Sequence, residues 1–197
     1  TGNTIQLSDS NALTLGNVNA SGDLTATGGG MLSVTGNVTG QAVNLQGVGV
    51  TNTGSITGMT SVTIDAGSGL LDNSGGVVAN SGPGTAPIVL KGDSMALVGG
   101  TVSGNVAPIT LTTGTSGRVI SLISGGGLVL GQAELDLPTT TGGLTIGDAS
   151  RTADITIGGT VATPVGSSGG FAINAGYDGM AGGSGRILDS GAGLLDV

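Results

Sequence analysis

The stretch LTATGGGMLSVTGNVTGQAVNLQGVGVTNTGSITGMTSVTI, residues 24–64, contains the same short pattern three times. An apolar, a polar and a second apolar residue follow one another at Leu24-Thr25-Ala26, Val43-Asn44-Leu45 and Val62-Thr63-Ile64. This alternation is typical of a β-strand, because successive side chains of a strand point to opposite faces. The triplets begin 19 residues apart, which predicts a repeat with one strand at the same place in each unit.

The repeat continues along the chain with longer intervals. Equivalent triplets begin at Ile88, Ile109 and Leu144, so the intervals after Val62 are 26, 21 and 35 residues. Shorter apolar positions between these strands follow Gly-Asn, Gly-Ser or Gly-Thr, at Val18, Val38, Ile56 and Val102. A repeat of about 20 residues with short strands and tight turns is one coil of a solenoid. The longer intervals are then coils with a loop at one corner.

We therefore predict an all-β fold, a right-handed parallel β-helix with coils of about 20 residues and three short strands each. The hand follows from the usual crossover preference of parallel strands. We expect about eight coils, no helix, and a single β-helix repeat segment over residues 1–197. The tail GAGLLD, residues 191–196, repeats GSGLLD, residues 67–72, and predicts that this segment belongs to a longer solenoid.

The composition excludes the main alternatives to this fold. Glycine accounts for 43 of 197 residues, but its irregular spacing differs from the glycine at every third position of collagen. Only 8% of the residues are charged and the mean hydropathy is +0.38, unlike a disordered chain. The LxxLxLxxN pattern of a leucine-rich repeat is absent. With one Phe, one Tyr and no Trp, the core consists of aliphatic side chains that suit thin stacked layers.

Charge and cysteine content narrow the classes of partner. Four basic and 12 acidic residues give a net charge of −8, which disfavours nucleic acid and anionic lipid as partners. No apolar run is long enough for a membrane helix and no signal segment opens the chain, so we expect no membrane insertion. The chain has no cysteine, which excludes disulfides and thiol chemistry.

Candidates for catalysis are few. Without His and Cys, no serine triad or thiolate pair can form. The best carboxylate pair is Glu134 and Asp136, which would project from one face of a strand about 7 Å apart, as in inverting glycosidases. Sugar-cleaving grooves also use aromatic and basic side chains, which this chain nearly lacks, so we interpret the pair as a solvated strand face. We predict no enzyme, no catalytic residue and no cofactor.

Asp148, Arg151 and Asp154 lie at a turn between two predicted strands. Opposite charges at this spacing could contact a ligand, but exposed ion pairs are common at turns and contribute little to stability. We therefore expect a surface ion-pair cluster.

The glycine-rich run from Tyr177 to Asp189 is the least regular part of the sequence. It is similar to a calcium-binding nonapeptide, but Arg186 and Ile187 follow GGSG where that motif needs an Asp, so we expect no metal site. Long irregular loops often carry contacts. Tyr177, Met180 and Arg186 are the predicted contact loop, with a disordered corner or a coil-to-coil linker as the alternative.

Threonines occupy the middle of four equivalent triplets, at Thr25, Thr63, Thr110 and Thr145. A parallel β-helix would align them in one outward rank, an arrangement that some ice-binding proteins use. Asn44 and Val89 interrupt the rank. We therefore interpret it as a threonine hydrogen-bond ladder next to the core.

The repeat style resembles a known family. Residues 12–30, 50–69 and 151–176, which read ALTLGNVNASGDLTATGGG, VTNTGSITGMTSVTIDAGSG and RTADITIGGTVATPVGSSGGFAINAG, are similar to the repeat region of filamentous haemagglutinin-like bacterial exoproteins. The resemblance covers nearly the whole chain. It implies a protein secreted through an outer-membrane partner, a right-handed parallel β-helix, and a role in adhesion, biofilm formation or contact-dependent interactions. It implies no catalytic motif.

Three hypotheses of different classes follow. The first is a rigid shaft of a secreted or bacterial cell-surface adhesin, with a host-surface protein or a glycan as its partner. The second is an extracellular fibre whose subunits self-associate through coil ends, because open coil ends offer unpaired backbone. The third is a carbohydrate-active β-helix enzyme, which needs a charged groove that the sequence lacks.

Overall fold

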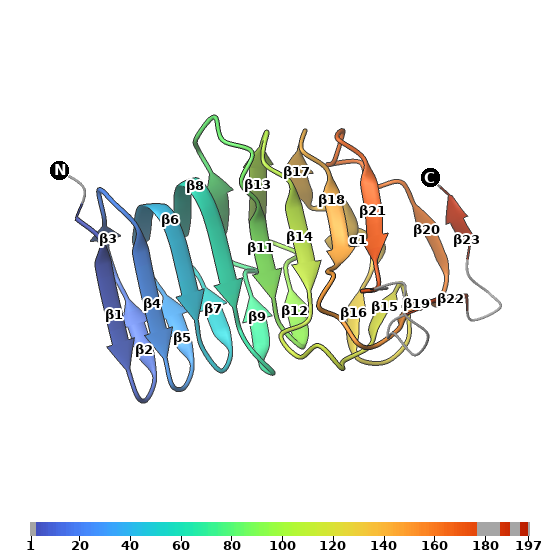
Figure 1. Cartoon of the computed structure of the whole chain (residues 1–197), viewed down its shortest axis with the longest axis horizontal. Coiled ribbons are helices and arrows are strands. Elements are labelled where there is room, and N and C mark those ends of the chain that lie inside the picture. The colour runs from blue at the N-terminus through green and yellow to red at the C-terminus, as the bar shows by residue number, and fades with distance from the viewer. Residues whose placement is uncertain (1–2, 177–185, 190–193, 197) are drawn as a thin grey trace.

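The computed structural model describes residues 3–176, 186–189 and 194–196. The chain winds into an elongated stack of coils in which every strand pairing is parallel (Figure 1). In Figure 1 the strands nearest the viewer point downward while the coils advance from left to right, which defines a right-handed helix. The predicted all-β, right-handed parallel β-helix is confirmed.

The first face of the β-helix is one continuous row of eight strands. They are β1 Ile5–Asp9, β4 Leu24–Gly28, β6 Asn37–Gln46, β8 Ser55–Asp65, β11 Ile88–Lys91, β14 Ile109–Thr112, β18 Leu144–Gly147 and β21 Phe171–Asn174. The predicted triplets pair in series, so that Leu24 lies opposite Val43 and Val43 lies opposite Val62. The same register joins Val62 to Ile88, Ile109 and Leu144 in turn. The described residues thus form the eight coils that the repeat predicted.

The second face is formed by short strands that follow those of the first. The first sheet of this face contains β2 Leu13–Leu15, β5 Leu32–Val34, β7 Val50–Asn52, β9 Leu70–Asp72 and β12 Ser94–Ala96. The second sheet contains β16 Leu128–Leu130, β15 Ile120–Leu122, β19 Ile155–Ile157 and β22 Ile187–Asp189. β16 contacts β12, so the two sheets succeed one another along the axis.

The third face begins with β3 Val18–Asn19 and the amino-terminal halves of β6 and β8, and it continues with β10 Val77–Asn80, β13 Thr101–Asn105 and β17 Pro138–Thr140. A single bridge joins Thr140 to Ser167 of the next coil. β20 Thr160–Ala162 and β23 Leu194–Asp196 form a separate pair. The tail motif LLD of β23 therefore pairs with β20, whereas the matching LLD of β9 lies on the second face.

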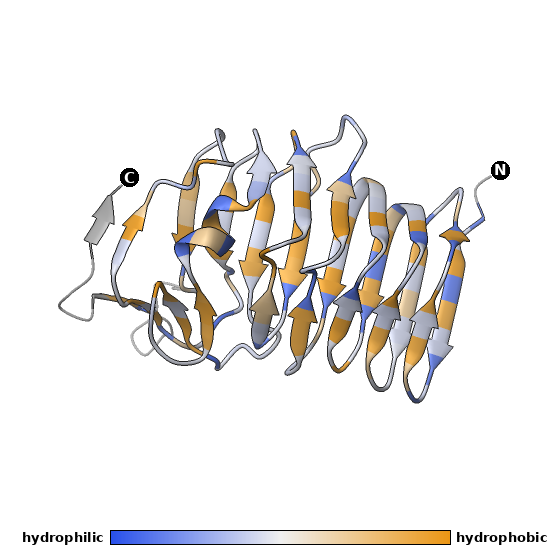
Figure 2. Cartoon of the chain, turned by 180° about the vertical axis from the view of Figure 1, so that it is seen from behind, coloured by the Kyte–Doolittle hydropathy of each residue, from blue (hydrophilic) through white to orange (hydrophobic). Residues whose placement is uncertain are grey.

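The core is a column of aliphatic side chains, one layer per coil. Leu24, Leu32 and Val38 are fully buried and represent the three faces of the coil. Figure 2 shows apolar and polar residues alternating along the strands, as the period of two requires. Coils approach closely at their corners: a Cβ on Gly100 would lie 1.7 Å from the carbonyl oxygen of Asn73 in the preceding coil. Only glycine fits there.

Buried asparagines link successive coils at a corner between the second and third faces. Asn52 and Asn73 are 2% and 0% exposed. The Asn52 side-chain amide donates to Oδ1 of Asn73 at 2.7 Å, and the Asn73 amide donates to the Thr101 carbonyl at 3.1 Å. Such buried polar groups stabilise the fold because each has its partner. The sequence reasoning missed this ladder, although the spacing of 21 residues between the two asparagines is close to the repeat.

One region departs from the regular winding. Along the chain β15 precedes β16, but in space β16 lies between β12 and β15. The chain therefore forms β15 first, one rung farther along the axis. It then returns to the rung next to β12 through the five-residue loop 123–127 and forms β16 there. Ile123 in that loop has φ +73°, a left-handed conformation that is unusual for a β-branched residue. The second face gains a strand that the first face lacks.

The one helix among the described residues, α1 Gln132–Asp136, follows directly. It contradicts the expectation that the chain has no helix. The side-chain amide of Gln132 makes the hydrogen bonds that a neighbouring strand would make with β20. Its Oε1 accepts from the Ala162 N–H at 3.0 Å and its Nε2 donates to the Ala162 carbonyl at 3.2 Å. The side-chain amide thus satisfies the edge of β20.

Candidate functional site

Charged side chains gather at the corner between the first and second faces, near the ends of β11, β14 and β18. All four basic residues of the chain lie in this part of the solenoid: Lys91, Arg118, Arg151 and Arg186. Three aspartates lie among them. Asp93 pairs with Arg118, and Asp154 pairs with Arg186 and accepts through its carbonyl from Arg151. Asp148 accepts from the hydroxyl of Thr112, the strand partner of Lys91. We call these seven residues, with Thr113 and Thr115, the polar corner.

Arg151 is at the centre of the polar corner and is only 1% exposed. Its Nη1 donates to the hydroxyl of Thr113 at 2.7 Å, and its Nη2 donates to the carbonyl of Arg118 at 2.6 Å. Nε is buried and has no hydrogen-bond partner. The predicted surface ion-pair cluster is wrong for this residue, because the fold buries Arg151 and gives it neutral oxygen acceptors in place of the carboxylates of Asp148 and Asp154.

Burial lowers the pKa of Arg151, because desolvation disfavours the charged guanidinium. The nearby carboxylates of Asp148 and Asp93 oppose that shift. For Asp148, burial raises the pKa, but hydrogen bonds from Ser150 and Thr112 outweigh burial and hold the pKa below its ordinary value. A buried cation with hydrogen-bond acceptors on separate segments acts as a tie, so Arg151 joins the turn after β18 to the loop before β15.

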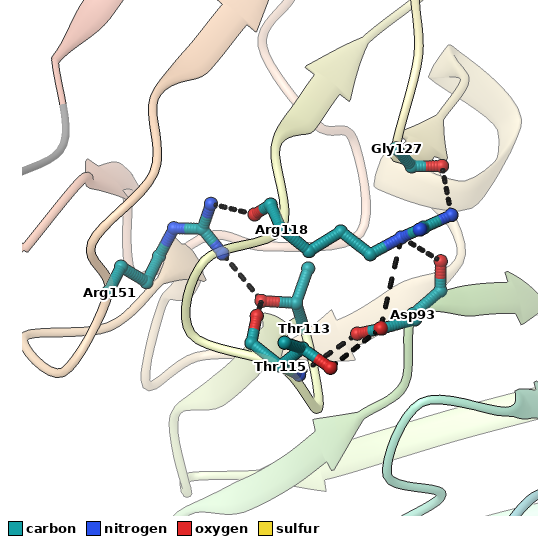
Figure 3. Close-up of polar contacts among 6 residues, drawn as sticks. All are labelled: Asp93, Thr113, Thr115, Arg118, Gly127 and Arg151. Atoms are coloured by element: carbon teal, nitrogen blue, oxygen red, sulfur yellow. Dashed lines mark hydrogen bonds and ion pairs between the residues drawn. The ribbon is translucent and has the colours of Figure 1, made fainter.

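Asp93 and Arg118 form the outer part of the polar corner (Figure 3). The Asp93 carboxylate, nearly buried, accepts from the backbone N–H of Thr115 at 2.9 Å and from its hydroxyl at 2.7 Å. Nε of Arg118 lies 4.0 Å from Oδ2 of Asp93 and donates to the Asp93 carbonyl at 3.0 Å. Nη2 of Arg118 donates to the carbonyl of Gly127 at 3.3 Å. The guanidinium is therefore held between two loops.

A hollow of about 500 Å³ opens beside Arg118. It is lined by Gly117, Arg118, Val119, Ser121, Gly125, Gly126, Gly127 and Thr156. The stepped-back loop between β15 and β16 forms one wall, and the outward face of β19 contributes Thr156. The irregular rung thus creates a recess on an otherwise flat face.

Of the predicted contact loop, only Arg186 belongs to the described residues; Tyr177 and Met180 lie outside them. Nη2 of Arg186 lies 3.1 Å from Oδ2 of Asp154, and the Arg186 N–H donates to Oδ1 of Asp154 at 2.8 Å. These hydrogen bonds lower the pKa of Asp154 and raise that of Arg186. The pair is exposed, so Asp154 forms a surface ion pair as predicted, but with Arg186 and not with Arg151.

Glu134 and Asp136 were predicted to share one face of a strand. This prediction is wrong, because both residues belong to α1. Residues two apart on a helix point in different directions. Oε2 of Glu134 accepts from the Gly131 N–H at 3.1 Å, and Oδ1 of Asp136 accepts from the Val165 N–H at 3.2 Å. Both carboxylates thus accept hydrogen bonds from backbone N–H groups. They are not the pair on one strand face that a glycosidase-like separation requires.

The threonine rank is aligned as predicted. Thr25, Asn44 and Thr63 occupy successive rungs, followed through Val89 by Thr110 and Thr145. All of these side chains are half-buried on the outer side of the first face. Among the hydrogen bonds of the described residues, none joins these threonine hydroxyls to one another, so the predicted ladder does not form. Buried asparagines at the corner link the coils instead.

Two further observations concern metal sites and membrane-spanning helices. Within the described ranges, no three side chains of the His, Cys, Asp and Glu types are grouped to hold a metal ion. The glycine-rich run that is similar to a calcium motif falls mostly outside those ranges. The same part of the chain contains no helix long and apolar enough to span a bilayer.

Comparison of the chain with protein-family models, with curated proteins and with solved structures gives no match. The features of the chain that bear on function are therefore its repeat, the polar corner and the hollow beside Arg118. The sequence pointed to one part of this region through Asp148, Arg151 and Asp154. It gave no sign of Arg118 or of the hollow, since their neighbours come from four separate segments.

Proposed function

We propose that this chain is a rigid, non-catalytic shaft of a secreted or cell-surface bacterial adhesin of the filamentous haemagglutinin-like kind, with a role in surface display, adhesion and biofilm formation. The observation that carries the proposal is the continuous row of eight parallel strands on the first face. Bending such a stack would stretch a row of backbone hydrogen bonds, so a long solenoid of this type is stiff. A stiff rod suits the display of contacts away from a cell surface.

A second candidate, a self-assembling extracellular fibre, is favoured by the first coil. Its inward side chains Ile5, Leu7 and Leu13 are only half-buried, whereas Leu24 and Leu32 in the next coil are fully buried. Within the described residues β1 pairs with β4 alone. A further coil stacked on this end, from the same protein or from another subunit, would bury the aliphatic layer and pair the open edge, and the fibre proposal takes that coil from another subunit.

Electron microscopy of the purified chain over a concentration series distinguishes the two candidates. Eight rungs at about 4.8 Å predict rods of about 40 Å. Rods of uniform length at every concentration are the expected result and support the shaft. Filaments that lengthen with concentration would contradict it in favour of the fibre.

Adhesion is tested separately on arrays of glycans and host-surface proteins with the labelled chain. We expect retention on a limited set of glycans or surface proteins. A matched control is the variant Leu90→Asp, which places a charge in the fully buried layer and should abolish both the rods and the retention. Rods that bind nothing on either array would leave the shaft without its adhesive role.

A further inference from the structure

We propose that the hollow beside Arg118 is a binding site for the carboxylate-bearing sugar of an acidic glycan, such as a uronic acid residue. The site rests on the proposed adhesive function only for the biological source of its ligand. Binding itself is a property of the hollow, and it is tested with free sugars.

The cation of the site is already fixed in place. Arg118 donates through Nε to the Asp93 carbonyl and through Nη2 to the Gly127 carbonyl, so two loops hold the guanidinium before any ligand arrives. Its side chain is nevertheless 41% exposed. No hydrogen bond of Nη1 is found within the part of the chain that the structure describes. A planar guanidinium with an open edge is suited to a bidentate carboxylate.

Asp93 does not neutralise Arg118 in the way a close ion pair would. Its two carboxylate oxygens accept from the N–H and the hydroxyl of Thr115, and the nearest approach to the guanidinium is 4.0 Å. Arg151 is hydrogen-bonded to the backbone carbonyl of Arg118, at the other end of that residue from its guanidinium (Figure 3). Arg118 is the one charged residue in the lining of the hollow, so the charge that a ligand meets there is positive although the net charge of the chain is −8.

The other walls of the hollow favour a sugar over an apolar acid. Ser121 and Thr156 contribute hydroxyls, and four glycines contribute backbone without side chains. The Ser121 hydroxyl is buried and donates to the Gly126 carbonyl at 2.7 Å, so it holds the loop that forms the wall. Thr156, which is half-buried, presents the hydroxyl that a sugar can reach. The one aliphatic side chain in the lining is that of Val119. The volume of about 500 Å³ accommodates one sugar residue with room for its neighbour.

The test is titration of the ¹⁵N-labelled chain with methyl glucuronide and, in parallel, with methyl glucoside. We expect saturable shifts of the amides of Gly125, Gly126 and Gly127 with the glucuronide at millimolar concentrations. Replacing the charge in Arg118→Gln should weaken binding about 10- to 100-fold, the effect of losing a charge-assisted hydrogen-bond pair. Arg186→Gln, which removes an arginine from the exposed pair with Asp154, should bind as the wild type.

A second variant tests the hollow without touching Arg118. A Cβ on Gly126 would meet no atom within 4 Å and the residue does not have a left-handed φ, so Gly126→Leu should fold and fill the hollow. Gly16→Leu is its matched control, since a Cβ at Gly16 also meets nothing and the residue lies in the first coil. We expect binding to be lost in the first variant and kept in the second.

Three results would overturn the site, of which the first two concern its specificity and its place. One is equal affinity for the glucuronide and the glucoside, and the other is glucuronide binding that survives Gly126→Leu. Absence of any shift in the wild type would also refute it, while leaving the shaft proposal to be decided by electron microscopy.

Discussion

The coils from β1 to β8 and the coils from β14 to β19 follow the same repeat with different regularity. In the first group each triplet lies 19 residues after the last and every corner is tight. In the second group the interval from Ile109 to Leu144 is 35 residues, and it contains the displaced strand β15, the helix α1 and three residues of the polar corner, Thr113, Thr115 and Arg118. Yet the first face continues through both groups without a break.

The comparison shows that a β-helix tolerates long insertions where the inward aliphatic positions stay in register. The stack needs one apolar layer per coil, and the corners are free to vary in length. The insertions also bring chemistry, because the regular coils have little besides aliphatic, hydroxyl and amide side chains. The recess, the buried arginine and the strained Ile123 all lie in the second group.

The largest expected effect is on the aliphatic layer, and it tests whether both groups are equally well packed. Leu45 in β6 and Leu130 in β16 are 1% and 0% exposed. Each Leu→Ala change should lower the free energy of unfolding by about 2–5 kcal/mol in urea denaturation. Val129→Ala, at an outward position of β16, is the control and should cost less than about 0.5 kcal/mol. A cost below about 1 kcal/mol at Leu130 would mean that β16 is loosely packed.

In the regular coils, the second prediction tests how much the hydrogen bonds of Asn52 and Asn73 contribute to stability. Asn73→Ala removes the buried acceptor of the Asn52 amide and a donor to the part-buried Thr101 carbonyl. We expect a loss of about 1–3 kcal/mol in the same assay, because buried partners are left unsatisfied. Asn19→Ala, whose side chain accepts from Thr39 at an exposed site, should cost less than about 0.5 kcal/mol. Equal losses would argue against the ladder.

On the irregular side, Gln132→Ala removes the side chain that satisfies the edge of β20. The free energy of unfolding should fall by about 0.5–1.5 kcal/mol, and hydrogen exchange at the Ala162 amide should become faster. Gln46→Ala, at an exposed position on the first face, is the control. Unchanged exchange at Ala162 would show that α1 does not stabilise β20.

The smallest effect is on acid stability at the polar corner. The folded-state pKa of Asp148 lies below the ordinary value of 3.8, so its contribution is present above that value and is lost as the pH falls through the folded pKa. Asp148→Asn should therefore lose less stability than the wild type between about pH 5 and about pH 3. Ser150→Ala, which removes the hydroxyl that donates to Oδ1 of Asp148 and keeps the backbone N–H that does the same, should change the profile in the same direction. An identical acid profile in all three proteins would contradict this assignment.

Some of the failed sequence interpretations have a common cause. Glu134 and Asp136 alternate with Leu135 and Leu137, which reads as a strand, and a helix of five residues is too short to display its own period. The turn around Arg151 is rich in charge and reads as surface, because nothing local reveals that Thr113 and the Arg118 carbonyl close over it. For Arg151 the deciding partners are therefore distant in sequence, whereas for Glu134 and Asp136 the local pattern is too short to tell a helix from a strand.

The sequence by itself determined the fold class, the strand triplets of the first face and their register, because the alternation of side chains and the spacing of the coils are both local, periodic signals. Tertiary structure alone decided the order of β15 and β16, the burial of Arg151 and the recess beside Arg118. Those features depend on which loops meet at a corner of the stack. A buried polar group is stable only where such a meeting supplies its hydrogen-bond partners.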